Sequence, residues 1–320
     1  MEEIKKSMLG GDEMKKVIYI VGMIALIAVI IVMPAAAGFE PGECDITVCA
    51  SGCDYTSMEV AAESATDGQT VCVYNGTYGG FITINTPNVT LKGEGADVVI
   101  WDGGSDNKIV FGDVSDASGC ILEGFTIKGA VAGSDLVKPL APDCIIRNCV
   151  FEGLSKAIQL AGDNTTFMNN TILDASYDLG GAEITGPNST FINNVVLNST
   201  GAYAAVSVET SGCTIANNTI RNSTGAAISI FDAGSGCENN TITRNNLISN
   251  YAGIELYNDP ATISNIKIYL NNFIDNVVTV TTSGTPAPAT IYWNSTEPIE
   301  YVWNGTTYTG YLGNYWSDYT

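Results

Sequence analysis

The sequence predicts an all-β protein: a right-handed parallel β-helix with three short strands per turn and a short N-terminal capping helix. Three observations lead to this class. A short motif recurs seven times at steps of 22 to 27 residues, as in a solenoid. Within each copy, two apolar positions have a spacing that no straight strand satisfies. A third apolar strand follows the motif in most copies. A β-sandwich is the alternative, but a sandwich requires no fixed period.

The motif reads aromatic or aliphatic residue, two residues, Asn, one residue, apolar residue. In the copy at Cys213–Ile230, Ile215 and Ile220 are five residues apart, so side chains that alternate along one strand cannot both point inward. We place a bend at Asn218, because Asn adopts the left-handed conformation of a sharp corner more readily than most residues. Gly124 takes this place in the first copy. We expect the corner amides to stack into a hydrogen-bonded ladder along the axis. The predicted ladder consists of Asn148, Asn170, Asn194, Asn218, Asn245 and Asn271.

Composition narrows the function classes. The chain has 13 basic and 34 acidic residues, a net charge of −21, which argues against nucleic acid because phosphates would be repelled. The chain contains no His, so the commonest general base and transition-metal ligand is missing. We expect an exposed, soluble surface.

The chain divides into four predicted regions. Residues 1–37 have a basic flank, an uncharged run at 17–33 and an A-x-A sequence typical of a cleavage site, and this pattern predicts an export signal. An uncleaved membrane anchor is the alternative, since the length of the uncharged run is near the lower limit for a membrane span. Residues 38–119 form an N-terminal cap and the first turns. Residues 120–284 form the regular repeats, and residues 285–320 an aromatic-rich C-terminal cap, for which a sugar-binding platform is the alternative.

Cysteine usage agrees with export. Cys44, Cys49, Cys53 and Cys72 cluster before the repeats, and we predict two disulfides among them, with three pairings open. A zinc site is the less favoured alternative, because the spacing is wrong and no His is present. Cys120 and Cys144 are one period apart and should stack as buried thiols or form a disulfide across two turns.

A short helix should cover the N-terminal end. Thr56–Glu59 reads as a capping box that opens a helix to about Ala65. Strands are then expected at Gln69–Val73, Phe81–Ile84 and Val89–Leu91, with a turn at Asn75 and Gly76.

Two segments carry a family resemblance. The sequence from Asp45 to Gly95, which includes Tyr55-Thr56-Ser57, resembles the N-terminal part of surface β-helix proteins of methanogenic archaea. The repeats resemble the NosD and sugar-hydrolase β-helices, which have the pectate-lyase-like fold, and Gly310–Thr320 resembles the segment that closes such archaeal repeat units. The resemblance implies an extracellular protein at the cell surface. The sequence reaches Thr320 without the Asp-rich loop expected in relatives, so no cofactor is carried over, calcium included, and the absence of His argues against copper.

The third strand of each turn offers the best candidate surface. Polar residues alternate there with the inward ones, and aromatic residues flank them, as in grooves that bind extended polysaccharides. The candidate glycan-binding residues are Gln159, Glu183, Tyr203, Phe231, Glu255 and Tyr257. A solvated strand face is the alternative.

Catalysis would need two carboxylates about 5 to 9.5 Å apart. Glu209 and Asp232 lie on adjacent predicted turns and are the weak candidates, whereas Glu183 and Glu255 are three turns apart. We therefore expect a structural, adhesive or glycan-binding envelope protein, with a polysaccharide hydrolase or lyase as the alternative. Sequons in predicted turns mark candidate glycosylation sites at Asn75, Asn198, Asn222, Asn294 and Asn304.

Overall fold

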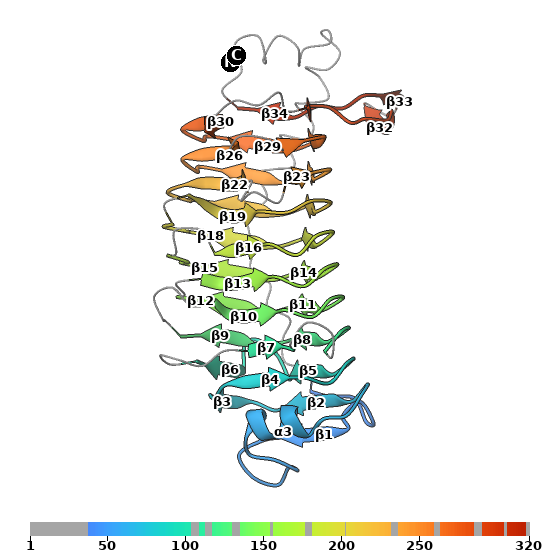
Figure 1. Ribbon diagram of the computed structural model, residues 1–320, viewed down its shortest axis with the longest axis vertical. Coiled ribbons are helices and arrows are strands. Elements are labelled where there is room, and N and C mark those ends of the chain that lie inside the picture. The colour runs from blue at the N-terminus through green and yellow to red at the C-terminus, as the bar shows by residue number, and fades with distance from the viewer. Residues whose placement is uncertain are drawn as a thin grey trace.

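The computed structural model describes residues 38–103, 109–112, 117–129, 135–153, 156–176, 181–201, 203–231, 236–258, 263–284, 290–303 and 306–317. The chain coils into a tall stack of three parallel sheets, with its N-terminal turns at one end and its C-terminal turns at the other (Figure 1). The predicted parallel β-helix is confirmed. The expected signal or anchor at 17–33 lies outside the described residues. Within them, no helix is long and apolar enough to cross a membrane.

The first strand of each turn belongs to sheet A. Thr recurs at the first position of its strands because an outward β-branched residue suits a half-exposed pleated surface. The strands of sheet A are β1 (Ile46–Val48), β2 (Thr70–Val73), β5 (Thr90–Gly93), β8 (Ile121–Glu123), β11 (Ile145–Arg147), β14 (Thr166–Met168), β17 (Thr190–Ile192), β20 (Thr214–Ala216), β24 (Thr241–Thr243), β28 (Ile266–Tyr269) and β31 (Ile291–Tyr292).

The second strand belongs to sheet B, which follows sheet A after the sharp corner. Its middle residues, such as Phe151, Ile172 and Ile220, point into the core and are fully buried. The strands of sheet B are β3 (Gly76–Tyr78), β6 (Val99–Asp102), β9 (Thr126–Lys128), β12 (Val150–Glu152), β15 (Thr171–Leu173), β18 (Val195–Leu197), β21 (Thr219–Arg221), β25 (Asn246–Ile248), β29 (Asn272–Ile274) and β34 (Tyr315–Trp316). The turn expected at Asn75 and Gly76 is wrong at Gly76, which begins β3.

The third strand belongs to sheet C, whose strands lengthen toward the C-terminal turns. The strands of sheet C are β4 (Ile82–Ile84), β7 (Ile109–Phe111), β10 (Asp135–Pro139), β13 (Lys156–Leu160), β16 (Ala182–Ile184), β19 (Ala204–Val208), β22 (Ala226–Phe231), β26 (Ala252–Asn258) and β30 (Val278–Gly284). A two-stranded pair, β23 (Cys237–Glu238) and β27 (Ile263–Ser264), forms beside the main sheets.

A helix and two disulfides lie at the N-terminal end. Helix α3 (Met58–Ser64) begins after Ser57, whose side chain accepts a hydrogen bond from the Val60 N–H; the cap is therefore Ser57 and not Thr56. Disulfides join Cys44 to Cys72 and Cys49 to Cys53, so the two predicted bridges are confirmed and their pairing is settled. Cys120 and Cys144 are buried free thiols on adjacent turns. This end of the first sheets is covered, which protects strand edges from pairing with other chains.

The C-terminal segment continues the stack and then leaves it. Strand β34 pairs with β29, and the ring of Trp316 stacks on that of Phe273 at 4.4 Å between centroids. Between β31 and β34 the chain forms an antiparallel hairpin of β32 (Ile299–Trp303) and β33 (Thr306–Gly310), which projects sideways from the stack (Figure 1). Aromatic residues of this segment thus pack on the last turn and also stand on the hairpin.

The corner between sheets A and B uses two consecutive residues. The first is left-handed, as in Asn217 with φ 56°. The second, Asn218, is buried, and its Oδ1 accepts from the N–H and Nδ2 of Asn194 at 2.8 and 3.1 Å. The ladder residues are Asn170, Asn194, Asn218, Asn245, Asn271 and, beyond the prediction, Asn314.

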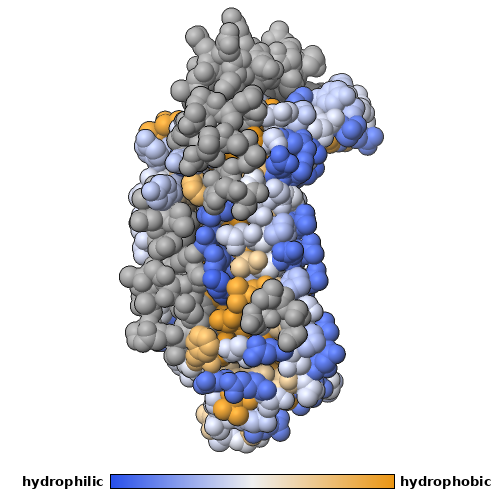
Figure 2. Space-filling model, viewed as in Figure 1, coloured by the Kyte–Doolittle hydropathy of each residue, from blue (hydrophilic) through white to orange (hydrophobic). Residues whose placement is uncertain are grey.

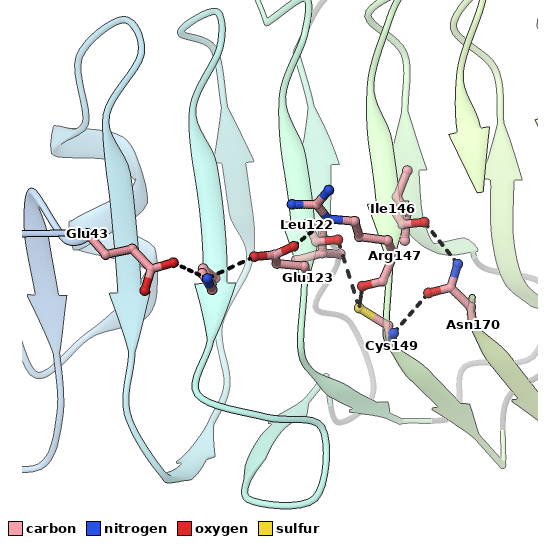
Figure 3. Close-up of polar contacts among 8 residues, drawn as sticks. Glu43, Leu122, Glu123, Ile146, Arg147, Cys149 and Asn170 are labelled. Carbon is pink, nitrogen blue, oxygen red and sulfur yellow. Dashed lines mark hydrogen bonds and ion pairs between the residues drawn. The ribbon is translucent and has the colours of Figure 1, made fainter. Parts of the chain in front are cut away.

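The expected place of Asn148 in this ladder is wrong. Ile146 pairs in register with Phe167, so Cys149 takes the ladder position, and its N–H donates to Asn170 Oδ1 at 2.9 Å (Figure 3). Asn148 is the left-handed residue one place earlier, with φ 55°, as is Gly124 with φ 79°. The alignment predicted for the copies that contain Gly124 and Asn148 was therefore wrong by one residue, because Asn is favoured at both the left-handed position and the ladder position.

Candidate functional site

The predicted surface on the third strands is one straight column. Register pairs Gln159 with Glu183, Glu183 with Ser207, Ser207 with Ser229, and Ser229 with Glu255. Parallel stacking places neighbours of the column about 4.8 Å apart. The middle of the column is buried: Glu183, Ser207 and Ser229 are almost inaccessible, whereas Gln159 and Glu255 are half-buried.

Aromatic residues flank this column at both ends of the strands. Phe231 ends β22 and lies opposite Tyr257 in β26, with ring centroids 4.9 Å apart. Tyr203 precedes β19 at the other end and is 56% exposed. The structure therefore brings Phe231 and Tyr257 together, whereas Tyr203 lies at the opposite, N-terminal end of the third strands.

Sequence reasoning missed a second tyrosine. Tyr251 precedes β26 as Tyr203 precedes β19, and it is 54% exposed. The sequence feature that could have revealed Tyr251 is its position immediately before Ala252 and the third strand, because Tyr203 stands in the same way immediately before Ala204.

Hydropathy varies along the stack on the side shown in Figure 2. Hydrophilic atoms gather in a strip along the middle turns, and hydrophobic atoms gather below them, toward the N-terminal turns.

The geometry does not assemble a carboxylate pair from the described residues of the column. Glu183 and Glu255 are three turns apart in register, which corresponds to about 14 Å, beyond the separation that glycosidases use. Glu209 follows β19, and its Oε1 accepts a hydrogen bond from Ser207 Oγ at 3.0 Å. Asp232, the other candidate, lies outside the described residues.

A second charged column crosses sheet A. Lys92 pairs with Glu43 and, at 3.3 Å between Nζ and Oε1, with Glu123, and Arg147 bonds to the same Glu123 (Figure 3). The hydrogen bond from Lys92 holds the pKa of Glu43 below its ordinary value. Burial lowers the pKa of Lys92, but the contacts with Glu43 and Glu123 outweigh this and raise it. Arg147 therefore neutralises a nearly buried carboxylate.

Comparison with known proteins identifies the family. A family model described as periplasmic copper-binding protein (NosD) matches residues 62–320. The chain belongs to the NosD family. No curated protein matches it.

Several solved structures align with this NosD-family chain. Pectin methylesterase from carrot aligns with a TM-score of 0.52 and 9% identity, over 79% of this chain and 87% of that one. An alginate lyase of polysaccharide lyase family 6 in complex with a trisaccharide aligns with a TM-score of 0.43 and 13% identity, over 79% and 87%. A lyase of the same family from Pseudopedobacter saltans has a TM-score of 0.41 and 14% identity, over 70% and 76%. At these identities the likeness concerns the fold alone.

The described residues do not fit the copper in the family's description. Copper(I) prefers thiolate and thioether ligands, and the five free cysteines are buried. Burial raises the pKa of Cys120 to about 11 and that of Cys149 to about 12, so these thiols stay protonated at neutral pH. No group of three or more Cys, Asp or Glu among the described residues could hold a metal ion. We therefore derive no copper chemistry.

Proposed function

We propose that this NosD-family protein is an exported envelope protein that binds a polysaccharide on the outer face of sheet C without cleaving it. The observation that carries the proposal is the register of β13, β16, β19, β22 and β26. It aligns the half-buried Gln159 and Glu255 in one column with three inaccessible polar residues, and it places aromatic rings at the margins of this column, so the accessible polar groups and the rings are the contacts that a sugar would make. Sugars need this combination, since their ring faces stack on aromatic rings and their hydroxyls bond to polar groups.

The repeat of the stack suits an extended ligand. Each turn offers an outward position about 4.8 Å further along the axis, so a chain of sugars laid along the axis can reach side chains of several turns. Phe231 and Tyr257 contact one another at 4.9 Å and form a continuous aromatic surface beside Ser229 and Glu255. The solved lyase with a bound trisaccharide is similar in fold only and adds no argument about the ligand.

Export is supported by the cysteines. Disulfides persist in oxidising compartments outside the cytosol, and the chain holds two of them in its N-terminal turns. The family's periplasmic description agrees with export. A position at the cell surface and an archaeal source, which the resemblance implied, are part of this proposal.

A polysaccharide panel tests the proposal. Binding would be measured by calorimetry on the full exported chain, with Phe231→Ala and Tyr257→Ala as site variants. Val60→Ala is the control, because Val60 is exposed on helix α3 at the N-terminal end, several turns from this column and outside the aromatic C-terminal segment. We expect at least a fivefold loss of affinity in each site variant and none in the control.

Product assays separate binding from turnover. Reducing ends and unsaturated products would be assayed on every polymer that binds. Turnover that is abolished in Glu209→Gln would overturn the non-catalytic proposal, and an absence of binding across the panel would overturn glycan recognition itself.

A further inference from the structure

Three consecutive turns present an unusual sequence of side chains just before the third strand. Register pairs Ala204 with Ala226 and Ala226 with Ala252. The residues one place earlier, Tyr203, Gly225 and Tyr251, therefore occupy the same position on successive turns. Two half-exposed tyrosines thus stand two turns apart, about 9.6 Å along the axis, with a glycine between them.

Position 225 itself cannot carry a side chain. A Cβ atom on Gly225 would lie 2.5 Å from the carbonyl oxygen of Tyr203 and 2.7 Å from its carbonyl carbon, well inside van der Waals contact. The close approach of the neighbouring turn thus requires glycine here. The turn between the two tyrosines consequently carries no ring.

Ring pairs elsewhere in the molecule show which distance separates rings on adjacent turns. Rings on adjacent turns of this protein stack at 5.1 Å for Phe167 and Phe191 and at 4.9 Å for Phe231 and Tyr257. Both distances lie within the range of favourable ring pairs. A ligand ring placed at Gly225 would be one turn from each tyrosine, and so at stacking distance from both.

Buried alanines follow these three positions at the start of the strands. Ala204, Ala226 and Ala252 form a cluster with Val278 that is separate from the main core. Ser229 lies three residues beyond Ala226 on β22, about 10 Å along the strand. The tyrosine position and the polar column therefore lie at two separate places along the same strands.

We propose that Tyr203 and Tyr251 form a subsite that holds one pyranose ring of the glycan between them, above Gly225. A pyranose suits it because both of its faces carry C–H groups that stack on aromatic rings while its edge carries hydroxyls. The inference rests on the proposed function and adds to it the position at which a single sugar unit is gripped.

The test uses two neutral hexasaccharides, one of β-1,4-linked glucose and one of β-1,4-linked N-acetylglucosamine, together with the best neutral polymer from the panel. Affinities would be measured for Tyr203→Ala, Tyr251→Ala, the double variant, both Tyr→Phe variants and the Val60→Ala control. We expect a fivefold to tenfold loss for each alanine variant. The phenylalanine variants should retain binding because the ring remains.

Coupling between the tyrosines distinguishes a shared subsite from two separate contacts. If both rings grip one sugar, the double variant should bind little worse than either single variant, because the first loss already opens the space. The subsite would be overturned if the losses multiplied in the double variant. It would also be overturned if both single variants kept their affinity while Phe231→Ala and Tyr257→Ala still weakened binding. Either result would leave the proposed function standing. Failure of both hexasaccharides and of every polymer in the panel to bind the unmodified protein would overturn both.

Discussion

Asn217 and Asn218 are adjacent residues of the same type with different roles. Asn217 is exposed and left-handed, with φ 56°. Asn218 is buried, and its Nδ2 donates to the Phe191 carbonyl and to Asn245 Oδ1, both at 2.9 Å. The first amide therefore serves the backbone conformation of the corner, whereas the second serves hydrogen bonding between turns.

Glycine substitution should separate these roles. Asn217→Gly should change the free energy of unfolding by less than about 1 kcal/mol, because glycine adopts a positive φ readily. Asn218→Gly should lower it by about 3 kcal/mol, because buried N–H and C=O groups lose their partners. Urea unfolding of both variants checks the pair. Equal losses would show that the ladder does not hold the turns together.

The buried thiols make stability depend on alkaline pH. Burial raises the pKa of Cys120 and Cys213 to about 11 and that of Cys144 to about 12. In the unfolded chain these thiols ionise near pH 8.5. Because the folded pKa is raised, their contribution to stability is complete below the unfolded value and is lost as pH rises toward the folded one.

We therefore expect the free energy of unfolding to fall between about pH 9 and pH 11, more steeply in the unmodified protein than in a Cys213→Ala variant. Denaturant titrations at half-unit pH steps would show the difference in slope. Other groups titrate in this range, so the comparison with the variant isolates the thiol. Identical slopes would contradict the assignment.

At the scale of elements, the C-terminal segment extends the column of amides by one turn. Asn314 Oδ1 accepts from the N–H of Asn271 at 3.0 Å, although the two residues are 43 positions apart. Trp316 follows in β34 and covers Phe273. The projecting hairpin is thus an insertion between two strands of the stack.

Removal of the Trp316 ring should loosen the last turns selectively. Trp316→Ala exposes Phe273, so amide hydrogen exchange should accelerate in β28 and β29 while β2 and β5 keep their protection, since each turn of a solenoid contacts mainly its neighbours. Tyr311→Ala, which removes an exposed ring, should change neither. Uniform acceleration along the whole stack would show that the protein opens as one cooperative unit.

The periodic elements could be predicted from the sequence, because each turn repeats the same demand for an inward apolar residue and a corner residue. In the turn where Cys149 takes the ladder position, the predicted alignment was wrong by one residue. Cys149 makes the ladder contact there, but the motif assigned that position to the neighbouring Asn148. The pairing of Cys44 with Cys72 depends on how β1 and β2 meet, which no local pattern encodes. The tyrosine subsite was missed because it depends on which residues share a register across separate turns.

At the scale of the whole molecule, charge determines which glycans can approach. The net charge is −21, and such a potential repels anionic ligands over a distance that salt controls. On the described outer face of sheet C, Glu183 and Glu255 share the column with Lys138, which stands one turn before Gln159. We therefore propose that the ligand is a neutral glycan and not a polyuronate.

Methyl-esterified and de-esterified oligogalacturonides offer matched probes, because they share a backbone and differ in charge. We expect the esterified form to bind at least tenfold more tightly at about 0.01 M salt, where the screening length is about 30 Å, and the gap to narrow at about 1 M, where it is about 3 Å. Glu255→Gln should reduce the gap more than Glu63→Gln, which removes an exposed charge on the distant helix α3. If the de-esterified form binds equally well at low salt, the carboxylates of sheet C do not select the ligand, and the column must instead be neutralised when a polyuronate is bound.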